Sequence, residues 1–174
     1  MSDPFARHGV KWLSPSSLNL FQGCPSFWVA KYLFKVNDEF GPAAKRGTAI
    51  EAGLDHWLFE GNEPRCAQIA LENFEMNTGG VCDDQHDAEA ALIPPMLKQA
   101  FKALEGLEKP NARQLKIEYR FDGIEVPIIG YIDYIWDEFG LDLKTTTRCP
   151  SSPKPEHVRQ VALYSAAKSK PFKL

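Results

Sequence analysis

Apolar positions along the chain change their spacing near Pro110. Before this proline, apolar side chains recur every three or four residues, which is typical of helices that bury one face. Ser14 followed by Pro15 marks the first helix start, because Ser caps a helix and proline suits its first turn. The expected helices begin at residues 13–18 and then cover residues 25–34, 45–59, 65–76 and 94–107, the last opened by Pro94 and Pro95.

After Pro110 the pattern becomes that of strands. Residues 115–121 alternate apolar and polar positions, and residues 126–136 are rich in Ile, Val and aromatic side chains. Asp122-Gly123 and residues 137–140 predict tight turns, so residues 141–147 form a third strand. A last helix is expected over residues 156–168, and residues 172–174 begin a fourth strand.

This order of elements predicts an α+β fold. The sheet is expected to be small and mixed, with three antiparallel strands plus a fourth, and to be flanked by helices. With 174 residues the chain is expected to be a single domain, residues 1–174, with a helical insertion at roughly residues 60–112.

Composition excludes several classes of protein. No run of residues approaches the ~18 apolar positions of a membrane span, and the first residues contain no apolar segment of a secretion signal. We therefore expect a cytoplasmic protein that does not contact membranes. Its four cysteines contain no CxxC pair, so we expect free thiols and no structural metal on them: Cys24, Cys66, Cys82 and Cys149.

The net charge of −3 is unevenly distributed. Residues 11–46 hold 5 Lys and Arg against 2 Asp and Glu, residues 47–142 hold 7 against 19, and residues 143–174 hold 7 against 1. The basic ends could follow a phosphate backbone, and cations would have to neutralise part of the acidic middle. The alternative is that these charge runs are ordinary solvated surfaces.

Asp133, Asp142 and Lys144 lie on two predicted neighbouring strands. Aspartate is unfavourable inside a strand, so the two carboxylates need an explanation. Residues two apart on a strand share a face, so Asp142 and Lys144 are expected to point the same way. The turn at residues 137–140 should bring Asp133 near Asp142, and two close carboxylates repel unless a cation lies between them. The alternative is an exposed hairpin with a weak ion pair.

Glu51 adds a third carboxylate from a predicted helix. Three carboxylates make an oxygen-rich site suited to one or two Mg²⁺ or Mn²⁺ ions, which can coordinate a phosphate and activate water. Lys144 could orient that water and offset charge on phosphate oxygens. Taken singly, Glu51 is better explained as a solvent-facing helix residue.

Gln160 and Tyr164 are four residues apart on the last predicted helix, and therefore share one face. They are either a polar edge of an amphipathic helix or a pair that faces the site. Arg159 and His157 flank Gln160 and could contact phosphate or simply be exposed.

Taken together, these motifs resemble the PD-(D/E)XK nuclease superfamily in its RecB-like branch, which includes phage and CRISPR-associated exonucleases. Each motif alone is weak, but their order along about 150 residues is specific. The matching segments are Leu13-Ser14-Pro15-Ser16-Ser17-Leu18 with Cys24-Pro25, Gly47-Thr48-Ala49-Ile50-Glu51, Gly130-Tyr131-Ile132-Asp133, Asp142-Leu143-Lys144-Thr145 and Gln160 to Tyr164.

The resemblance implies a restriction-endonuclease-like core and a role for each matching residue. Glu51, Asp133, Asp142 and the carbonyl of Leu143 would be metal ligands, and Lys144 would be the catalytic lysine. The residues expected to support the site or contact DNA are Gln160, Tyr164, Arg159 and Arg46.

The sequence departs from the family in two places. Position 51 is Glu where many RecB-like nucleases have His, and Glu still suits Mg²⁺ or Mn²⁺. Some relatives bind an iron–sulfur cluster through an N-terminal cysteine and three that follow the Q-x-x-x-Y helix. Cys24 matches the first, but no cysteine follows Tyr164, so no cluster is expected. The family continues beyond this point, so the sequence could be a truncated form.

The leading hypothesis is therefore a metal-dependent deoxyribonuclease, an exonuclease acting on DNA ends or single strands in recombination, repair or phage DNA processing. This hypothesis places the protein in a bacterial or phage-infected cell, with DNA and recombination proteins as partners. Two alternatives remain: a catalytically silent DNA-binding or recombination protein with the same fold, and an endonuclease that trims DNA ends.

Overall fold

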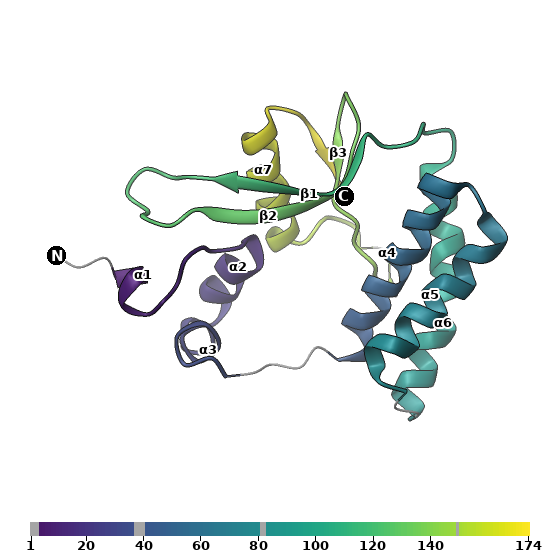
Figure 1. The fold of residues 1–174 in the computed structure, drawn as a ribbon, viewed down its shortest axis with the longest axis horizontal. Helices are drawn as coiled ribbons and strands as arrows, with labels where there is room; N and C mark the ends of the chain where they lie inside the picture. Colours follow the sequence, from purple (N-terminus) through teal and green to yellow (C-terminus); the bar gives the residue numbers. More distant parts are fainter. Residues whose placement is uncertain (1–3, 37–40, 81–82, 149) are drawn as a thin grey trace. The chain divides into compact units, whose positions relative to one another are not determined.

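The helices and strands of the chain belong to two units (Figure 1). The computed structural model describes residues 4–36, 41–80, 83–148 and 150–174. The first unit, called the sheet unit here, comprises Met1–Asp38, Asn111–Asp142 and Arg148–Leu174. The second, called the helical unit, comprises Glu39–Pro110 and Leu143–Thr147.

The sheet unit is built on four strands in the order β1-β2-β3-β4. Their bounds are β1 Ala112–Tyr119, β2 Ile128–Ile135, β3 Gly140–Leu141 and β4 Phe172–Lys173. β1 pairs antiparallel with β2, β2 pairs antiparallel with β3, and β3 pairs parallel with β4. The expected α+β class and mixed sheet are therefore confirmed, including the fourth strand.

The third strand is much shorter than predicted. It spans Gly140–Leu141, whereas the sequence pattern predicted residues 141–147. Strand pairing requires a partner along its length, and β4 pairs with β3 over only two residues. Asp142 still donates its backbone N–H to the Lys173 carbonyl at 3.1 Å. Asp142 and Lys144 thus lie beyond the strand, so the argument that they share a strand face was wrong.

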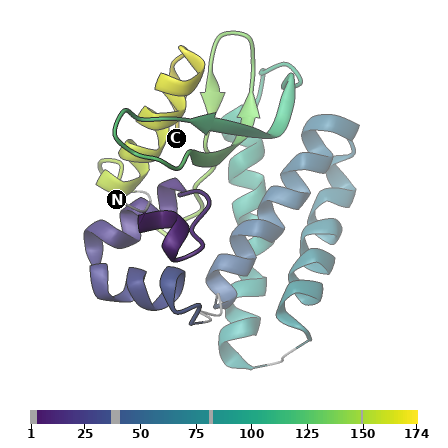
Figure 2. The same cartoon turned by 60° about the vertical axis from the view of Figure 1, so that its left-hand side comes forward.

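Helices pack around the strands within the sheet unit. They are α1 Pro4–Arg7, α2 Pro15–Gly23, α3 Pro25–Trp28, the π-helical turn η1 Val29–Leu33, and α7 Pro155–Lys168. The predicted cap of α2 is present, because the Ser14 hydroxyl accepts the Ser17 N–H at 3.1 Å and the Ser17 hydroxyl accepts the Ser14 N–H at 2.9 Å. Helix α7 runs alongside the strands (Figure 2).

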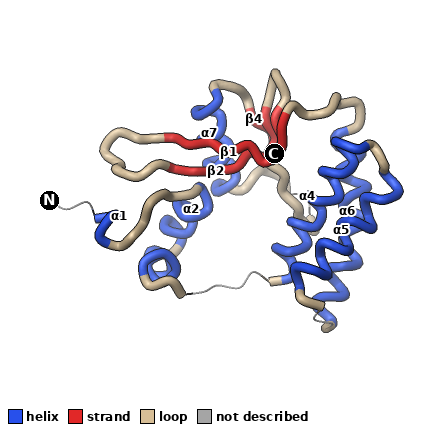
Figure 3. The backbone as a smooth tube through the Cα atoms, in the orientation of Figure 1, coloured by secondary structure: helices blue, strands red, loops and turns tan. Residues whose placement is uncertain are grey.

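The helical unit consists of three long helices that lie side by side (Figure 3). They are α4 Pro42–Glu60, α5 Glu63–Thr78 and α6 Asp84–Leu104. Their facing sides are apolar and almost fully buried, with a core that includes Ile50, Leu54, Ala70, Phe74, Ile93 and Leu97. Helical spacing of apolar positions predicted both α4 and α5 as helices.

Helix α6 corrects the prediction that Pro94 and Pro95 begin a helix, because both prolines lie inside it. The helix begins ten residues earlier, where the Asp83 side chain accepts the His86 backbone N–H at 2.7 Å. An interior proline costs about 3 kcal/mol. Burial of apolar residues on both sides of the prolines, from Ile93 to Leu104, offsets that cost.

Cys24 and Cys66 are free thiols, the first exposed and the second buried. Burial raises the pKa of the Cys66 thiol. Cys82 and Cys149 lie outside the described residues, so the expectation for them stays a prediction. Every helix in the described part of the chain is too short or too polar to span a lipid bilayer.

Candidate active site

Asp142 is the most deeply buried of the predicted site residues, with 1% of its surface exposed. Its Oδ1 accepts a hydrogen bond from the Gln160 side-chain amide at 2.9 Å. An ionised carboxylate in the protein interior is costly unless it is paired, hydrogen-bonded or bound to a metal. A buried Asp at the end of a strand is therefore a strong indication of a functional site.

Gln160 connects Asp142 to Tyr164. The same amide nitrogen donates to the Tyr164 hydroxyl at 2.9 Å, so both of its hydrogens are used. Gln160 and Tyr164 lie one turn apart on α7, as their spacing predicted. The helix thus holds the carboxylate through an amide with a defined orientation.

Tyr164 is almost fully buried, and its environment keeps it protonated. Burial raises the pKa of the Tyr164 hydroxyl to about 12, and the charges of Asp142 and Asp133 act in the same direction. The hydrogen bond from Gln160 acts in the opposite direction. Tyr164 is therefore a neutral hydroxyl at physiological pH, and both aspartates are near enough to affect it.

Gly130 on β2 makes room for the Tyr164 ring. A Cβ at this position would lie 2.7 Å from a ring carbon of Tyr164. That distance is too short for any side chain, so α7 can approach the strand only over a glycine. Gly130, over which α7 packs, thus lies three residues before Asp133 on the same strand.

Asp133 is half-buried on β2, and the pairs on either side of it, Arg113–Tyr134 and Leu115–Ile132, place it beside Gln114 of β1. The Gln114 amide donates to Asp133 Oδ1 at 3.2 Å, and Gln114 itself has φ +46°, in the left-handed region. Non-glycine residues rarely adopt this conformation, which occurs preferentially at functional sites. The sequence gives no local sign of Gln114, because only the strand register places it next to Asp133.

The register also places the two aspartates at corresponding positions. Tyr134 pairs with Leu141 in the antiparallel β2–β3 ladder. Asp133 precedes Tyr134 and Asp142 follows Leu141, so both aspartates lie at the end of the β2–β3 ladder that is farther from the turn. The close approach of their side chains stays a prediction.

Glu51, Leu143 and Lys144 belong to the helical unit. A Cβ on Gly47 would lie 3.4 Å from the Thr145 hydroxyl oxygen, so the segment Leu143–Thr147 packs against α4 there. Glu51 is one turn after Gly47 and shares its helix face. Within this unit, the segment that carries Lys144 therefore lies along the face of α4 that carries Glu51.

No three His, Cys, Asp or Glu side chains among the described residues form a group that could hold a metal ion. The predicted ligands are divided between the two units, with Asp133 and Asp142 in one and Glu51 and Leu143 in the other. Their assembly into one site stays a prediction.

Arg46 and Arg159 have contrasting environments. Arg46 is 5% exposed and forms an ion pair with Glu89, which joins α4 to α6. Arg159 is exposed on α7, and its Nε donates to Asn19 Oδ1 of α2 at 2.9 Å. The exposed guanidinium is accessible to an anion, whereas that of Arg46 is already paired inside the helical unit.

Comparison with known proteins gives the class of this protein. The model of the PD-(D/E)XK nuclease superfamily matches residues 12–173. The chain therefore belongs to the PD-(D/E)XK nuclease superfamily, and this membership makes it a nuclease. Nucleases of this superfamily use divalent metal ions, and DNA is the substrate that membership implies.

A solved structure supports the same fold. The chain is similar to a crystal structure described as "Putative exonuclease" from Eubacterium rectale, with a TM-score of 0.61 and 15% sequence identity. The match covers 99% of this chain and 70% of the other. No curated protein compared with the chain matches it.

Proposed function

We propose that this protein is a divalent-metal-dependent DNA exonuclease of the RecB-like branch, which hydrolyses phosphodiester bonds at DNA ends with Mg²⁺ or Mn²⁺. The observation that carries the proposal is the buried carboxylate of Asp142, oriented by Gln160 and Tyr164 on a nuclease fold. A role in DNA recombination, repair or phage DNA processing follows from the resemblance to that branch.

The chemistry of the donor set fits such a cation. Asp133, Asp142, Glu51 and the Leu143 carbonyl offer only oxygen, which is the ligand type that Mg²⁺ and Mn²⁺ prefer. Gln160 orients the Asp142 carboxylate without cancelling its negative charge, because an amide carries no net charge. These four groups would hold the metal ions.

The side chains around them have separate tasks. When bound, a divalent cation supplies Lewis-acid polarisation of the phosphate and favours deprotonation of the attacking water. The Lys144 ammonium would orient the water and offset negative charge that develops on the phosphate oxygens. Tyr164, with its pKa raised to about 12, stays protonated and holds Gln160 instead of moving a proton.

A digestion time course on DNA labelled at the 5′ or 3′ end tests the proposal. Single-stranded DNA, duplex DNA or both should be shortened from an end with Mg²⁺ or Mn²⁺, and EDTA should stop the reaction. Lys144→Ala should abolish cleavage, whereas Lys11→Ala, which removes an exposed lysine, should not.

Two outcomes would contradict the proposal. Cleavage of covalently closed circular DNA would show an endonuclease. Binding of DNA without cleavage in either Mg²⁺ or Mn²⁺ would show a catalytically silent protein of the same fold.

A further inference from the structure

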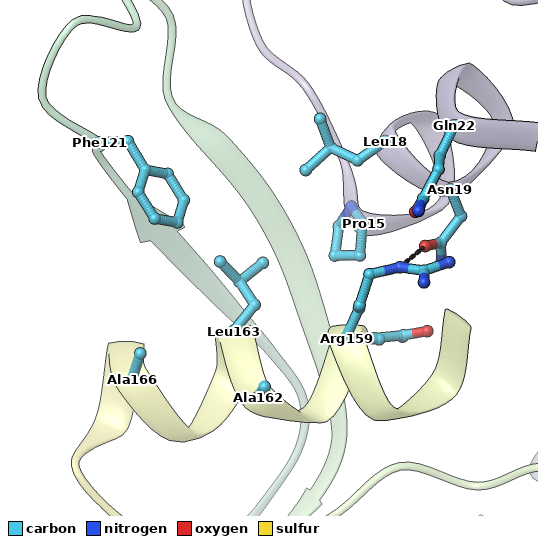
Figure 4. Close-up of a pocket in the computed structure, with 10 residues that line it drawn as sticks. Pro15, Leu18, Asn19, Gln22, Phe121, Arg159, Ala162, Leu163 and Ala166 are labelled. Carbon is cyan, nitrogen blue, oxygen red and sulfur yellow. Dashed lines mark hydrogen bonds between the residues drawn. The ribbon is translucent and has the colours of Figure 1, made fainter. Parts of the chain in front are cut away.

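A pocket of about 380 Å³ lies beside Gln160 in the sheet unit. It is formed by α2, by α7 and by Phe121, which follows β1 (Figure 4). The volume is at the lower end of the range for small-ligand sites, roughly 300–1,000 Å³. It therefore suits one compact group.

The wall of the pocket is largely apolar. Figure 4 shows the side chains of Phe121, Leu18 and Leu163 around a common space. Phe121 and Leu18 are 43% and 36% exposed, which is unusual for large apolar side chains unless something covers them. A flat apolar group could stack on the Phe121 ring.

One end of the pocket is polar and positively charged. The Nε of Arg159 donates to Asn19, and the Asn19 amide donates to the Glu156 carbonyl at 3.2 Å, so the guanidinium is held in place. Within the part of the chain that the structure describes, no carboxylate forms an ion pair with Arg159. Its charge is therefore available to an anion.

The pocket is also connected to the candidate active site. Gln160 lines it and donates to Asp142 at 2.9 Å. A group held in the pocket would thus be one side chain away from the carboxylate.

We infer that this pocket binds one unpaired nucleotide of the DNA strand next to the phosphate that is cleaved. An unpaired base has a flat apolar face for Phe121 and Leu18, and its phosphate is the anion that Arg159 attracts. A base inside a duplex is stacked on its neighbours and cannot enter. The inference rests on the proposed nuclease function and adds a requirement for an unpaired end.

A fluorescent base analogue tests this. The full chain is mixed in EDTA with single-stranded oligonucleotides that carry 2-aminopurine at successive positions. The fluorescence should be quenched by stacking at one position. Phe121→Ala should remove that quenching and weaken binding about tenfold, because the stacking of the base on the ring is lost. Binding of blunt duplex DNA should not change.

Two further variants are informative. Phe34→Ala removes an aromatic ring that is 74% exposed in the same unit and does not line the pocket, and it should behave like the wild type. Arg159→Gln should weaken binding at every sequence and make it less dependent on salt concentration, because one phosphate contact is lost. If thermal unfolding shows that Phe121→Ala is misfolded, Leu18→Asp replaces it and should also remove the quenching.

The outcomes separate this inference from the proposed function. If the wild type cleaves DNA but quenching is equal at all positions, or persists in Phe121→Ala, the pocket does not hold a base and the nuclease proposal stands. If quenching follows the expected pattern without cleavage in Mg²⁺ or Mn²⁺, the pocket is correct and the nuclease proposal fails. If the wild type neither binds nor cleaves, both are wrong.

Discussion

The two units of the chain bury polar groups in different ways. In the sheet unit, the Asp142 carboxylate is held by the neutral amide of Gln160, which also donates to Tyr164. In the helical unit, the Arg46 guanidinium forms an ion pair with Glu89. The amide gives the carboxylate a defined orientation, whereas the ion pair joins two opposite charges. Both units bury polar side chains, but only in the sheet unit is the buried carboxylate linked to two polar residues on one helix face.

Breaking the ion pair of the helical unit should have the largest effect on stability. Arg46→Met leaves the half-buried Glu89 without its cation, and removing one partner of a buried ion pair costs about 3–5 kcal/mol. Urea unfolding of the variant measures the loss. The double variant Arg46→Met/Glu89→Leu should recover most of it, because well-packed apolar residues can replace a buried pair.

The control for this prediction is Arg65→Met, which removes an exposed arginine from α5 and should change stability little. A double variant as unstable as the single one would show that the pair does more than neutralise charge.

Removing a carboxylate from either unit should stop catalysis without unfolding the protein. Asp142→Asn in the sheet unit and Glu51→Gln in the helical unit should each lower kcat at least about 100-fold, because each removes charge that the transition state requires. Measured rates of end-labelled DNA digestion check this, and Asp122→Asn in the exposed turn is the matched control.

Full activity of Glu51→Gln, with loss of activity in Asp142→Asn, would restrict the active site to the sheet unit. It would also remove the reason to expect that both units contribute ligands.

Adding one methyl group at a tightly packed glycine should destabilise both units by similar amounts. A Cβ on Gly130 would meet the Tyr164 ring at 2.7 Å, and one on Gly53 would meet the Cys66 carbonyl oxygen at 2.8 Å. Overpacking of this kind costs about 1–3 kcal/mol. Gly130→Ala should in addition lower DNA cleavage, because Tyr164 and Gln160 move with α7.

Gly23→Ala is the control, since nothing lies within 4 Å of a Cβ at that position. Equal loss of cleavage activity in Gly130→Ala and Gly53→Ala would show that the effect is general destabilisation and not a displaced helix.

The smallest effect is expected at alkaline pH. The pKa of Tyr164 rises from 10.0 to about 12 in the folded protein, mainly through burial. The neutral form is favoured by folding, so its contribution to stability is complete below pH 10 and is lost as pH rises through about 12. Tyr164→Phe should show a smaller loss of stability between these values. The free energy of unfolding in urea at pH 9 and pH 11 measures it, and equal losses in both proteins would contradict the assignment.

The sequence by itself determined the fold class, the β1–β2 and β2–β3 hairpins and the pairing of Gln160 with Tyr164 on one helix face. These features depend on local rules, since helical and strand periodicity and turn chemistry are written in neighbouring residues. The order of the motifs also sufficed to predict the PD-(D/E)XK superfamily, which the family comparison shows.

Only the tertiary structure decided the rest. Helix α6 continues through Pro94 and Pro95 because apolar side chains on both sides of them are buried against other helices. Strand β3 ends at Leu141 because β4, distant in sequence, pairs with only two of its residues. Gln114 meets Asp133 because of the strand register, and Gln160 reaches Asp142 because Gly130 lets α7 approach. Each of these depends on contacts between residues far apart in the chain, whose free energies outweigh local preference and leave no local pattern in the sequence.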